Sequence, residues 1–374
     1  MADDTLGPWR LEPNRVQRFY RGGALLERFR SGGAASGDDA DRPEDWVGSA
    51  TRAWTPPGTP PTSDGLSVVR VGGLERRIAD LLADDPDAIA GAPLVAAAGA
   101  STGLLVKLLD AAVRLPVHAH PSRAFARRHL GSFFGKAEAW LVIDTRQIAG
   151  EQPPGVRLAF RHDIAPTELR RLVEDERTEA ILDAMHHRPT APGDVWFIPP
   201  GLPHAIGAGV FMVEIEEPSD FSVVIETRDV PIDPINASLG LGWDDAIESL
   251  DVRGWSDADV DALRHEPVDI ASMPELDHVG LTAAAADPYF RAQRLTVRRT
   301  ATPWRENAFL VGVVTDGAGS AAVGDTRIDV RAGDTFAVPA ASLRALELSG
   351  APTLGLIACL PPRADDLAAV PEER

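Results

Sequence analysis

The chain has 374 residues, of which 37 are basic and 56 acidic, so its formal net charge is −19. A protein this acidic does not hold DNA or RNA by bulk electrostatics, and its single cysteine, Cys359, excludes a disulfide framework and a zinc site built on several thiolates. The acidic start lacks the pattern of a secretory signal and no run of about 18 apolar residues occurs, so we expect a cytoplasmic globular protein.

In the first half of the chain the predicted secondary structure changes from irregular to helical and then to strands. Residues 1–65 are rich in glycine and proline turns and predict irregular structure with few regular elements. A short helix is predicted at 73–83, and the mixed three- and four-residue spacing of apolar residues over 94–112 predicts a buried helix or helix pair. From Leu115 onward, short apolar segments with a period of two predict strands, interrupted by a helical stretch at about 166–186.

The second half returns to strands after a turn-rich connector at 233–265 with two short helical stretches. Many short strands joined by Gly and Asp turns are typical of small barrels or sandwiches, so the pattern predicts a mainly β protein with two barrels. A weak internal repeat supports two related units, because segments 192–206 and 332–346 share Gly-Asp-x-Phe/Trp-x-x-Pro. The first copy carries His204 where the second carries Arg344, so any chemistry of that histidine belongs to the first unit.

The histidines give the first indication of chemistry. His118 and His120 are two apart in a strand-like segment, so their side chains leave the same face, and Lys136 and Glu138 share a face by the same rule. His204 follows the rigid turn Pro-Pro-Gly-Leu-Pro. Two or three imidazoles and one carboxylate suffice to hold a divalent first-row metal, although histidines in strands also serve as ordinary packed or surface residues. On the residues alone, both interpretations stay open.

Two longer blocks resemble a known family. VKLLDAAVRLPVHAHPSRAFARRHLGSFFGKAEAWLVIDT and GDVWFIPPGLPHAIGAGVFMVEIEEPSD resemble the two signature regions of the type I mannose-6-phosphate isomerases (phosphomannose isomerases), which are metal-dependent cupins. In the first block the lysine-bearing KLLD segment corresponds to a helix end. RFYRGGALLERF, PEDWVGSA and AFLVGVVTDGAGSAAVG resemble further segments of that family, so the match covers most of the chain.

The resemblance implies two cupin (jelly-roll) barrels with a helical insertion in the first. Residues 1–230 correspond to a metal-binding cupin domain with an N-terminal extension and an insertion at about 163–190. Residues 231–285 correspond to a helical connector, and 286–374 to a second, metal-free cupin domain.

The resemblance also implies a site. His120, Glu138 and His204 match the family's metal ligands, and His118 offers a fourth where the family usually has glutamine or lysine. One divalent ion per chain is implied, with Zn²⁺ as the first choice. Lys136 and Glu214 match candidate catalytic groups, and both of the chain's lysines, Lys107 and Lys136, fall in the first block.

The implied reaction is a metal-dependent aldose–ketose isomerisation, mannose 6-phosphate to fructose 6-phosphate or a related sugar, by proton transfer through an enediol. Either Lys136 or Glu214 could be the base, since burial can bring an amine or a carboxyl toward neutrality. The expected partner is a small-molecule sugar or sugar phosphate, and neither a nucleic acid nor a membrane.

The chain departs from the family at one position. Five residues after the serine of the Ser-Asp pair the family has an arginine, and here that position is Val224. By period two, Ser222 and Arg228 share its face, and together with the aromatic face of Trp140 they are the predicted substrate contacts. Two other functions are kept: a non-catalytic sugar-binding cupin, and a cupin metalloenzyme of another class that uses a metal held by three histidines and a glutamate.

Overall fold

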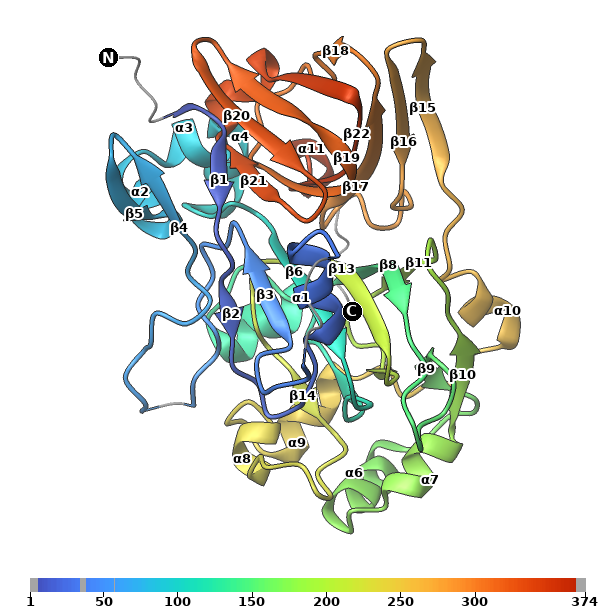
Figure 1. The fold of residues 1–374 in the computed structure, drawn as a ribbon. Coiled ribbons are helices and arrows are strands. Elements are labelled where there is room, and N and C mark those ends of the chain that lie inside the picture. Colours follow the sequence, from blue (N-terminus) through green and yellow to red (C-terminus); the bar gives the residue numbers. More distant parts are fainter. Residues whose placement is uncertain (1–5, 34–37, 57, 368–374) are drawn as a thin grey trace.

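A nine-stranded antiparallel sheet contains most of the C-terminal strands. In the computed structural model, which describes residues 6–33, 38–56 and 58–367, this sheet occupies the upper part of the molecule (Figure 1). Its order is β1-β21-β19-β22-β17-β16-β15, with β18 paired to β22 and β20 to β19. The bounds are β1 (Trp9–Leu11), β15 (Val268–Met273), β16 (Leu276–Gly280), β17 (Arg291–Val297), β18 (Thr300–Ala301), β19 (Leu310–Val323), β20 (Thr326–Arg331), β21 (Thr335–Val338) and β22 (Glu347–Leu360).

Two smaller antiparallel sheets below it carry the histidine and carboxyl residues of interest. A six-stranded sheet has the order β11-β8-β13-β6-β3-β2, and a five-stranded sheet has the order β10-β9-β12-β7-β14. The six-stranded sheet contains β2 (Arg15–Val16), β3 (Glu44–Val47), β6 (Leu105–Ala111), β8 (Glu138–Thr145), β11 (Val195–Ile198) and β13 (Val210–Glu216). The five-stranded sheet contains β7 (His118–Ala119), β9 (Gly155–Phe160), β10 (Met185–Pro189), β12 (His204–Ile206) and β14 (Val223–Val224), and a separate hairpin joins β4 (Val68–Val71) to β5 (Leu74–Arg77).

Short helices lie between the strands along the chain. Helices α6 to α9 lie at the lower end of the molecule in Figure 1, away from the nine-stranded sheet. Helix α6 begins at Pro166, whose fixed φ suits a first helical position, and it buries Leu169 and Val173. None of the helices in the described ranges has the length and apolar character needed to cross a bilayer. The helices are α1 (Ala24–Arg30), α2 (Ile78–Asp84), α3 (Pro86–Ala90), α4 (Ala92–Ala98), α5 (Arg123–Phe125) followed by a π-helical turn (Ala126–Leu130), α6 (Pro166–Glu174), α7 (Thr178–Asp183), α8 (Pro234–Ala237), α9 (Trp243–Ala246) followed by a 3-10 turn (Ile247–Ser249), α10 (Asp257–Asp261), a 3-10 turn (Ala340–Ala345) and α11 (Ala364–Leu367).

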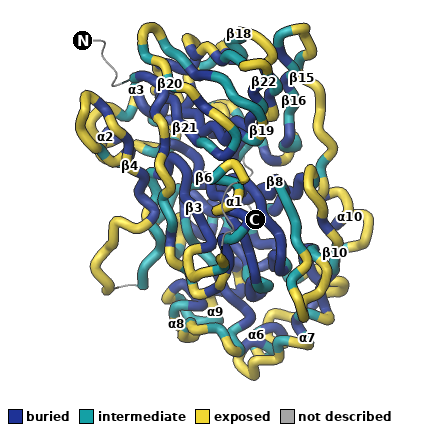
Figure 2. Tube along the Cα trace, in the orientation of Figure 1, coloured by how far each residue is buried: buried dark blue, intermediate teal, exposed yellow. Residues whose placement is uncertain are grey.

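One apolar core joins the six-stranded sheet to the nine-stranded sheet. It contains Val106 and Val213 of the former and Val311 and Ile357 of the latter, all nearly inaccessible to solvent. Figure 2 shows this buried centre as a continuous dark region. Because side chains alternate along a strand, the residues of β8 that do not face this core point to the opposite side of the sheet, where the candidate site lies.

The structure corrects one predicted element and modifies others. The prediction of a helix or helix pair over 94–112 is wrong for most of its length, because α4 ends at Ala98 and Leu105–Ala111 form strand β6. Every residue of β6 is buried, so its sequence lacks the alternation that reveals a half-exposed strand. Lys107 therefore lies in the middle of a strand and not at a helix end.

Other predictions agree with the structure in outline. The strands expected after Leu115 are present, and two helices, α6 and α7, occupy the predicted helical stretch. The predicted helical connector contains α8 to α10, but its last part forms β15 and β16, which join the nine-stranded sheet, as β1 does from the other end of the chain. The mainly β class with antiparallel sheets is thus observed.

Candidate metal centre

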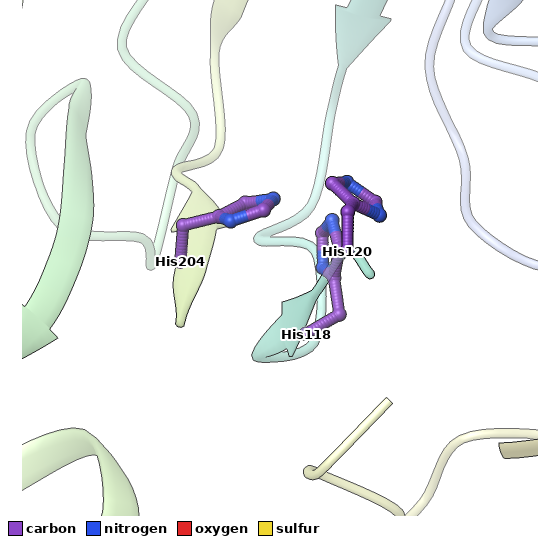
Figure 3. Close-up of side chains that lie close together, drawn as sticks. All are labelled: His118, His120 and His204. Carbon is purple, nitrogen blue, oxygen red and sulfur yellow. The ribbon is translucent and has the colours of Figure 1, made fainter. Parts of the chain in front are cut away.

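Three histidines converge from two neighbouring strands. His118 begins β7 and lies opposite His204 of β12 in the strand register, while His120 follows directly after β7. The ring centroids are separated by 4.3 Å between His118 and His204, by 5.0 Å between His118 and His120, and by 4.9 Å between His120 and His204. Figure 3 shows the three rings gathered on one side of these strands. The side chains predicted to share a face do so.

Main-chain carbonyls orient all three rings. In each ring Nδ1 lies at hydrogen-bond distance from a carbonyl oxygen, which assigns the proton to Nδ1 and leaves the lone pair on Nε2. In His204 this Nε2 is buried and has no hydrogen-bond partner. An unpartnered buried acceptor is costly unless another group completes it. The carbonyl partners are Pro116 for His118 (2.8 Å), Phe221 for His120 (2.6 Å) and Leu202 for His204 (2.7 Å).

Burial also fixes the charge of the rings. Removal from solvent lowers the pKa of His118, His120 and His204 to about 3, and the mutual proximity of the rings adds to this effect. The three imidazoles are therefore neutral at physiological pH, the form in which histidine binds metals.

Glu138, the first residue of β8, completes the group. Its Oε1 lies 2.8 Å from Nε2 of His120, and its Oε2 lies 3.6 Å from Nε2 of His204. Burial alone would raise the pKa of Glu138, but its contacts with His120 and Lys136 outweigh burial and hold the pKa well below the ordinary 4.5. The side chain is thus a carboxylate.

These four side chains fit a divalent metal ion. Three neutral nitrogens from the histidines lie within 4.8 Å of one another, and an anionic oxygen from Glu138 faces them. The unpartnered Nε2 of His204 is the acceptor that a cation would complete. Nitrogen and carboxylate donors of this kind suit first-row divalent ions.

A second buried cluster of carboxyl groups and lysines adjoins the histidines. Nζ of Lys136 lies 2.6 Å from Glu138 Oε1 and 3.0 Å from Glu216 Oε2, and Nζ of Lys107 lies 2.9 Å from Glu216 Oε1 and 3.4 Å from Glu214 Oε2. Burial alone would lower the pKa of both amines, but these carboxylates outweigh it and raise the pKa of each lysine above 10.5. Both lysines are therefore cations in this structure.

Glu214 and Glu216 differ from Glu138 in protonation, because burial raises the pKa of both above the ordinary 4.5. Burial, reinforced by the nearby charge of Glu138, raises the pKa of Glu214 to about 7. The indole Nε1 of Trp140 donates to both carboxyl groups, at 3.1 Å from Glu138 Oε2 and 3.1 Å from Glu214 Oε1. Trp140 is fully buried, so its two hydrogen bonds hold these carboxyl groups in a fixed orientation.

A cavity of about 200 Å³ opens beside both clusters. Ser222 lines it, with Oγ 3.3 Å from Nδ1 of His120. Trp140 and Arg228 are not among the described residues that line the cavity, and Arg228 pairs instead with Glu179 at 2.9 Å. The cavity is lined by Arg18, Phe19, Tyr20, Glu44, Trp54, Lys107, Leu109, Leu115, Pro116, His118, Lys136, Glu138, Ile206, Glu214, Asp220, Ser222, Val224, Ile232, Asn236 and Leu239.

Several of these residues carry charges that the sequence did not single out. Arg18 bridges Glu44 at 2.9 Å and Asp220 at 3.0 Å, and the hydroxyl of Tyr20 donates to Glu44. Arg18 and Asp220 lie about two hundred positions apart in the chain, so no local spacing connects them. The period of two in β13 could have drawn attention to Glu216 beside Glu214.

Fold and site together define a class, a mainly β metal-binding protein whose candidate metal centre borders a cavity. No family model matches the chain. The chain is 26% identical over 279 residues to GmuF of Bacillus subtilis, named a probable mannose-6-phosphate isomerase, a match that covers 74% of this chain and 80% of that one. It is 25% identical over 237 residues to the mannose-6-phosphate isomerase of Streptococcus mutans, covering 63% and 68% of the two chains.

Solved structures show the same fold. The mannose 6-phosphate isomerase of Bacillus subtilis superposes with a TM-score of 0.67 at 19% identity, covering 94% of this chain and 99% of that one. A variant of the phosphomannose isomerase of Salmonella typhimurium superposes with a TM-score of 0.68 at 13% identity, covering 95% and 99%. The chain is thus similar in sequence and in fold to mannose-6-phosphate isomerases, as its two motif blocks predicted.

Proposed function

We propose that the protein is a metal-dependent aldose–ketose isomerase that interconverts mannose 6-phosphate and fructose 6-phosphate or a related pair of sugars. The observation that carries this proposal is that Glu214, a carboxyl group whose pKa burial raises to about 7, lines the same cavity as His118 and Glu138 of the candidate metal centre. The names of the relatives support the same reaction class.

The metal ligands in this proposal are His118, His120, His204 and Glu138, with one ion per chain and Zn²⁺ as the first choice because it accepts mixed nitrogen and oxygen donors. A divalent ion held there would polarise the sugar oxygen at the reacting carbons and so acidify the neighbouring proton. The unpartnered Nε2 of His204 supports this ligand set.

The isomerisation requires a group that takes a proton from one carbon and returns it to the next. Glu214 is suited to this task, because a base works best when its pKa lies near the working pH. Lys136 pairs with two carboxylates and its pKa is raised, so we assign it a different role, holding Glu138 and Glu216 in place as a cation. Ser222 is the proposed hydrogen-bond partner of the sugar from the cavity wall.

The positions of the proposed ligands also support a division of the chain into domains. All four proposed ligands precede residue 230, which supports a metal-binding cupin over 1–230 and a second, metal-free cupin over 286–374. The shared apolar core between the six-stranded and nine-stranded sheets means that the two units would not be independent in stability.

The decisive experiment is a coupled assay of metal-loaded protein with mannose 6-phosphate and fructose 6-phosphate detection. Turnover is expected for the native chain and for the surface control Glu151→Gln, because Glu151 is exposed. Turnover is expected to disappear in Glu138→Gln. If native protein converts neither mannose 6-phosphate nor any other aldose above the Glu138→Gln level, the protein is not an isomerase. Thermal stabilisation by a sugar without conversion would then indicate a binding protein.

A further inference from the structure

Another cavity lies on the outer face of the five-stranded sheet that holds two of the histidines. It has a volume of about 200 Å³ and is lined mainly by residues of β9, β10 and β12 and of the loop before β9. Strands β9 and β10 lie side by side, with α7 close to their lower end (Figure 1). In the strand register Ala205 lies opposite Arg157, whereas its neighbour His204 lies opposite Leu158. Because side chains alternate along a strand, this cavity and the metal centre lie on opposite faces of the sheet.

The floor of this outer cavity is formed by residues with little or no side chain. Gly155, Ala205 and Gly207 all line it. A Cβ atom on Gly155 would lie 2.7 Å from Nε2 of His187, and one on Gly207 would lie 2.4 Å from the carbonyl oxygen of Gly155. Neither glycine can carry a side chain unless its neighbours move, so the hollow beside Arg157 stays open.

Arg157 is a half-buried cation in this hollow that has no carboxylate partner. Its Nη1 donates to the carbonyl oxygen of Leu182 at 2.9 Å, and it forms no ion pair with a carboxylate of the described ranges. The second arginine of the wall, Arg114, is occupied, because its two Nη atoms bind Glu226 at 2.7 and 2.6 Å. A guanidinium has five N–H donors, so Arg157 keeps most of its donors for a ligand.

The surroundings of Arg157 favour an added negative charge. Burial lowers the pKa of Arg157, and the guanidinium groups of Arg114 and Arg161 lower it further, against the opposing charges of Asp183 and Glu226. Arginine keeps its proton in spite of such a shift, so the cost of the half-buried cation remains. An anion that enters the hollow would offset this cost.

We propose that the outer cavity is a binding site for a small oxyanion of the phosphate type, held by the guanidinium of Arg157 and the imidazole of His187. A guanidinium presents a planar pair of N–H donors that matches two oxygens of a phosphate group. The imidazole of His187, which also lines the cavity, adds a further N–H donor. Residues 150–153 of the wall are exposed, so an organic substituent on the phosphate would extend to solvent. The site does not depend on the proposed isomerase reaction.

Calorimetric titration of the full-length protein with inorganic phosphate tests the site. Arg157→Met is expected to weaken phosphate binding at least about tenfold, because charge-assisted hydrogen bonds are lost. The matched control is Arg171→Met, which removes the same charge from an exposed position of α6, and its affinity is expected to stay within about twofold. Phosphate held at the metal centre would bind equally to both variants, so only their difference reports on the outer cavity. Equal affinity in the two variants, or no phosphate binding by the native protein, would overturn the proposal.

A variant at an exposed residue keeps the proposal testable if Arg157→Met does not fold. Gln152→Glu adds a negative charge to the cavity wall without removing a buried contact, and it is expected to weaken phosphate binding at least about threefold. Unchanged affinity in this variant would contradict the location of the site. Tighter binding of glycerol phosphate than of inorganic phosphate would identify a phosphate ester as the ligand, and the reverse order would identify free phosphate. Tighter binding of acetate than of either would overturn the phosphate class.

Discussion

His204 and His118 lie opposite each other on neighbouring strands, but they differ in burial, so we expect their substitution to affect metal binding to different degrees. His204 is fully buried, with its Nε2 unpartnered, whereas His118 is half-buried and lines the cavity. We therefore expect His204→Ala to abolish metal binding, because alanine leaves a buried gap in the donor set. In His118→Gln the amide oxygen can take the place of the lost nitrogen donor, so metal binding is expected to weaken by on the order of 10- to 100-fold. Elemental analysis of purified variants measures both, and normal metal content in His204→Ala would contradict the ligand assignment.

The same burial sets the pH range over which the centre can bind metal. A free histidine with a pKa near 6.5 loses metal to protons as the pH falls below that value. Burial lowers the pKa of His118, His120 and His204 to about 3, so these rings stay neutral far below pH 6.5. Metal affinity is expected to change little between pH 8 and pH 5.5 in a competition titration against a chelator of known pH dependence. A steady tenfold loss per pH unit below 6.5 would show that the rings titrate as exposed histidines.

At the scale of elements, β1 ties the start of the chain to the C-terminal sheet. It pairs with β21, and its pattern buries Trp9 and Leu11 while Arg10 faces outward. Leu11→Ala is expected to lower the free energy of unfolding by about 2–5 kcal/mol, since it opens a cavity in the core shared by two sheets. The exposed neighbour provides the control, and Glu12→Ala is expected to stay within about 0.5 kcal/mol. Urea unfolding distinguishes them, and equal losses would mean that β1 is not part of the cooperative core.

Strand β8 was predictable from its residue pattern, and strand β6 was not. At the start of β8 and just before it, the alternation of Lys136, Glu138 and Trp140 with apolar residues indicated both the strand and its functional face. Strand β6 lies between β13 and β3 with every residue buried, so its apolar run matched a helical pattern as well as a strand pattern. The element that carries Lys107 was missed for that reason.

The site was predictable only where its residues are close in sequence. The two-residue spacing of His118 and His120 placed them on one face, and the motif blocks added Glu138 and His204. The contacts of Arg18 with Glu44 and Asp220 depend on the tertiary fold, and an arginine in an arginine-rich chain resembles any solvated residue. Arg228 was predicted as a substrate contact because the strand period placed it on the same face as Ser222. In the structure its side chain instead pairs with Glu179.

At the scale of the whole molecule, Arg123, the first residue of α5, connects the segment after the histidine strand to the C-terminal part of the chain. Arg123 is 4% exposed, and its Nε donates to Glu217 at 2.5 Å. Its Nη2 donates to the carbonyl of Pro288 at 2.8 Å, and its guanidinium lies 4.9 Å from the ring centre of Tyr289. Glu217 in turn accepts from the main-chain N–H of Ala137, next to Glu138. A single buried ion pair thus links the candidate metal centre to the segment that precedes β17.

Removing this arginine tests whether the two parts of the chain depend on each other. Arg123→Met is expected to cost about 3–5 kcal/mol of unfolding free energy, because Glu217 is left buried without its cation. Arg70→Met removes an arginine from a pair more than 70% exposed on both sides and is expected to cost less than about 1 kcal/mol. Burial already holds the pKa of Glu217 above its ordinary value although Arg123 opposes this effect, and without Arg123 the pKa rises further. Protonation then relieves the unpaired charge, so the loss should shrink as the pH is lowered from 8 toward 5. Denaturant unfolding at both pH values measures this, and a loss no larger than that of Arg70→Met would mean that the ion pair does not couple the metal centre to the C-terminal sheet.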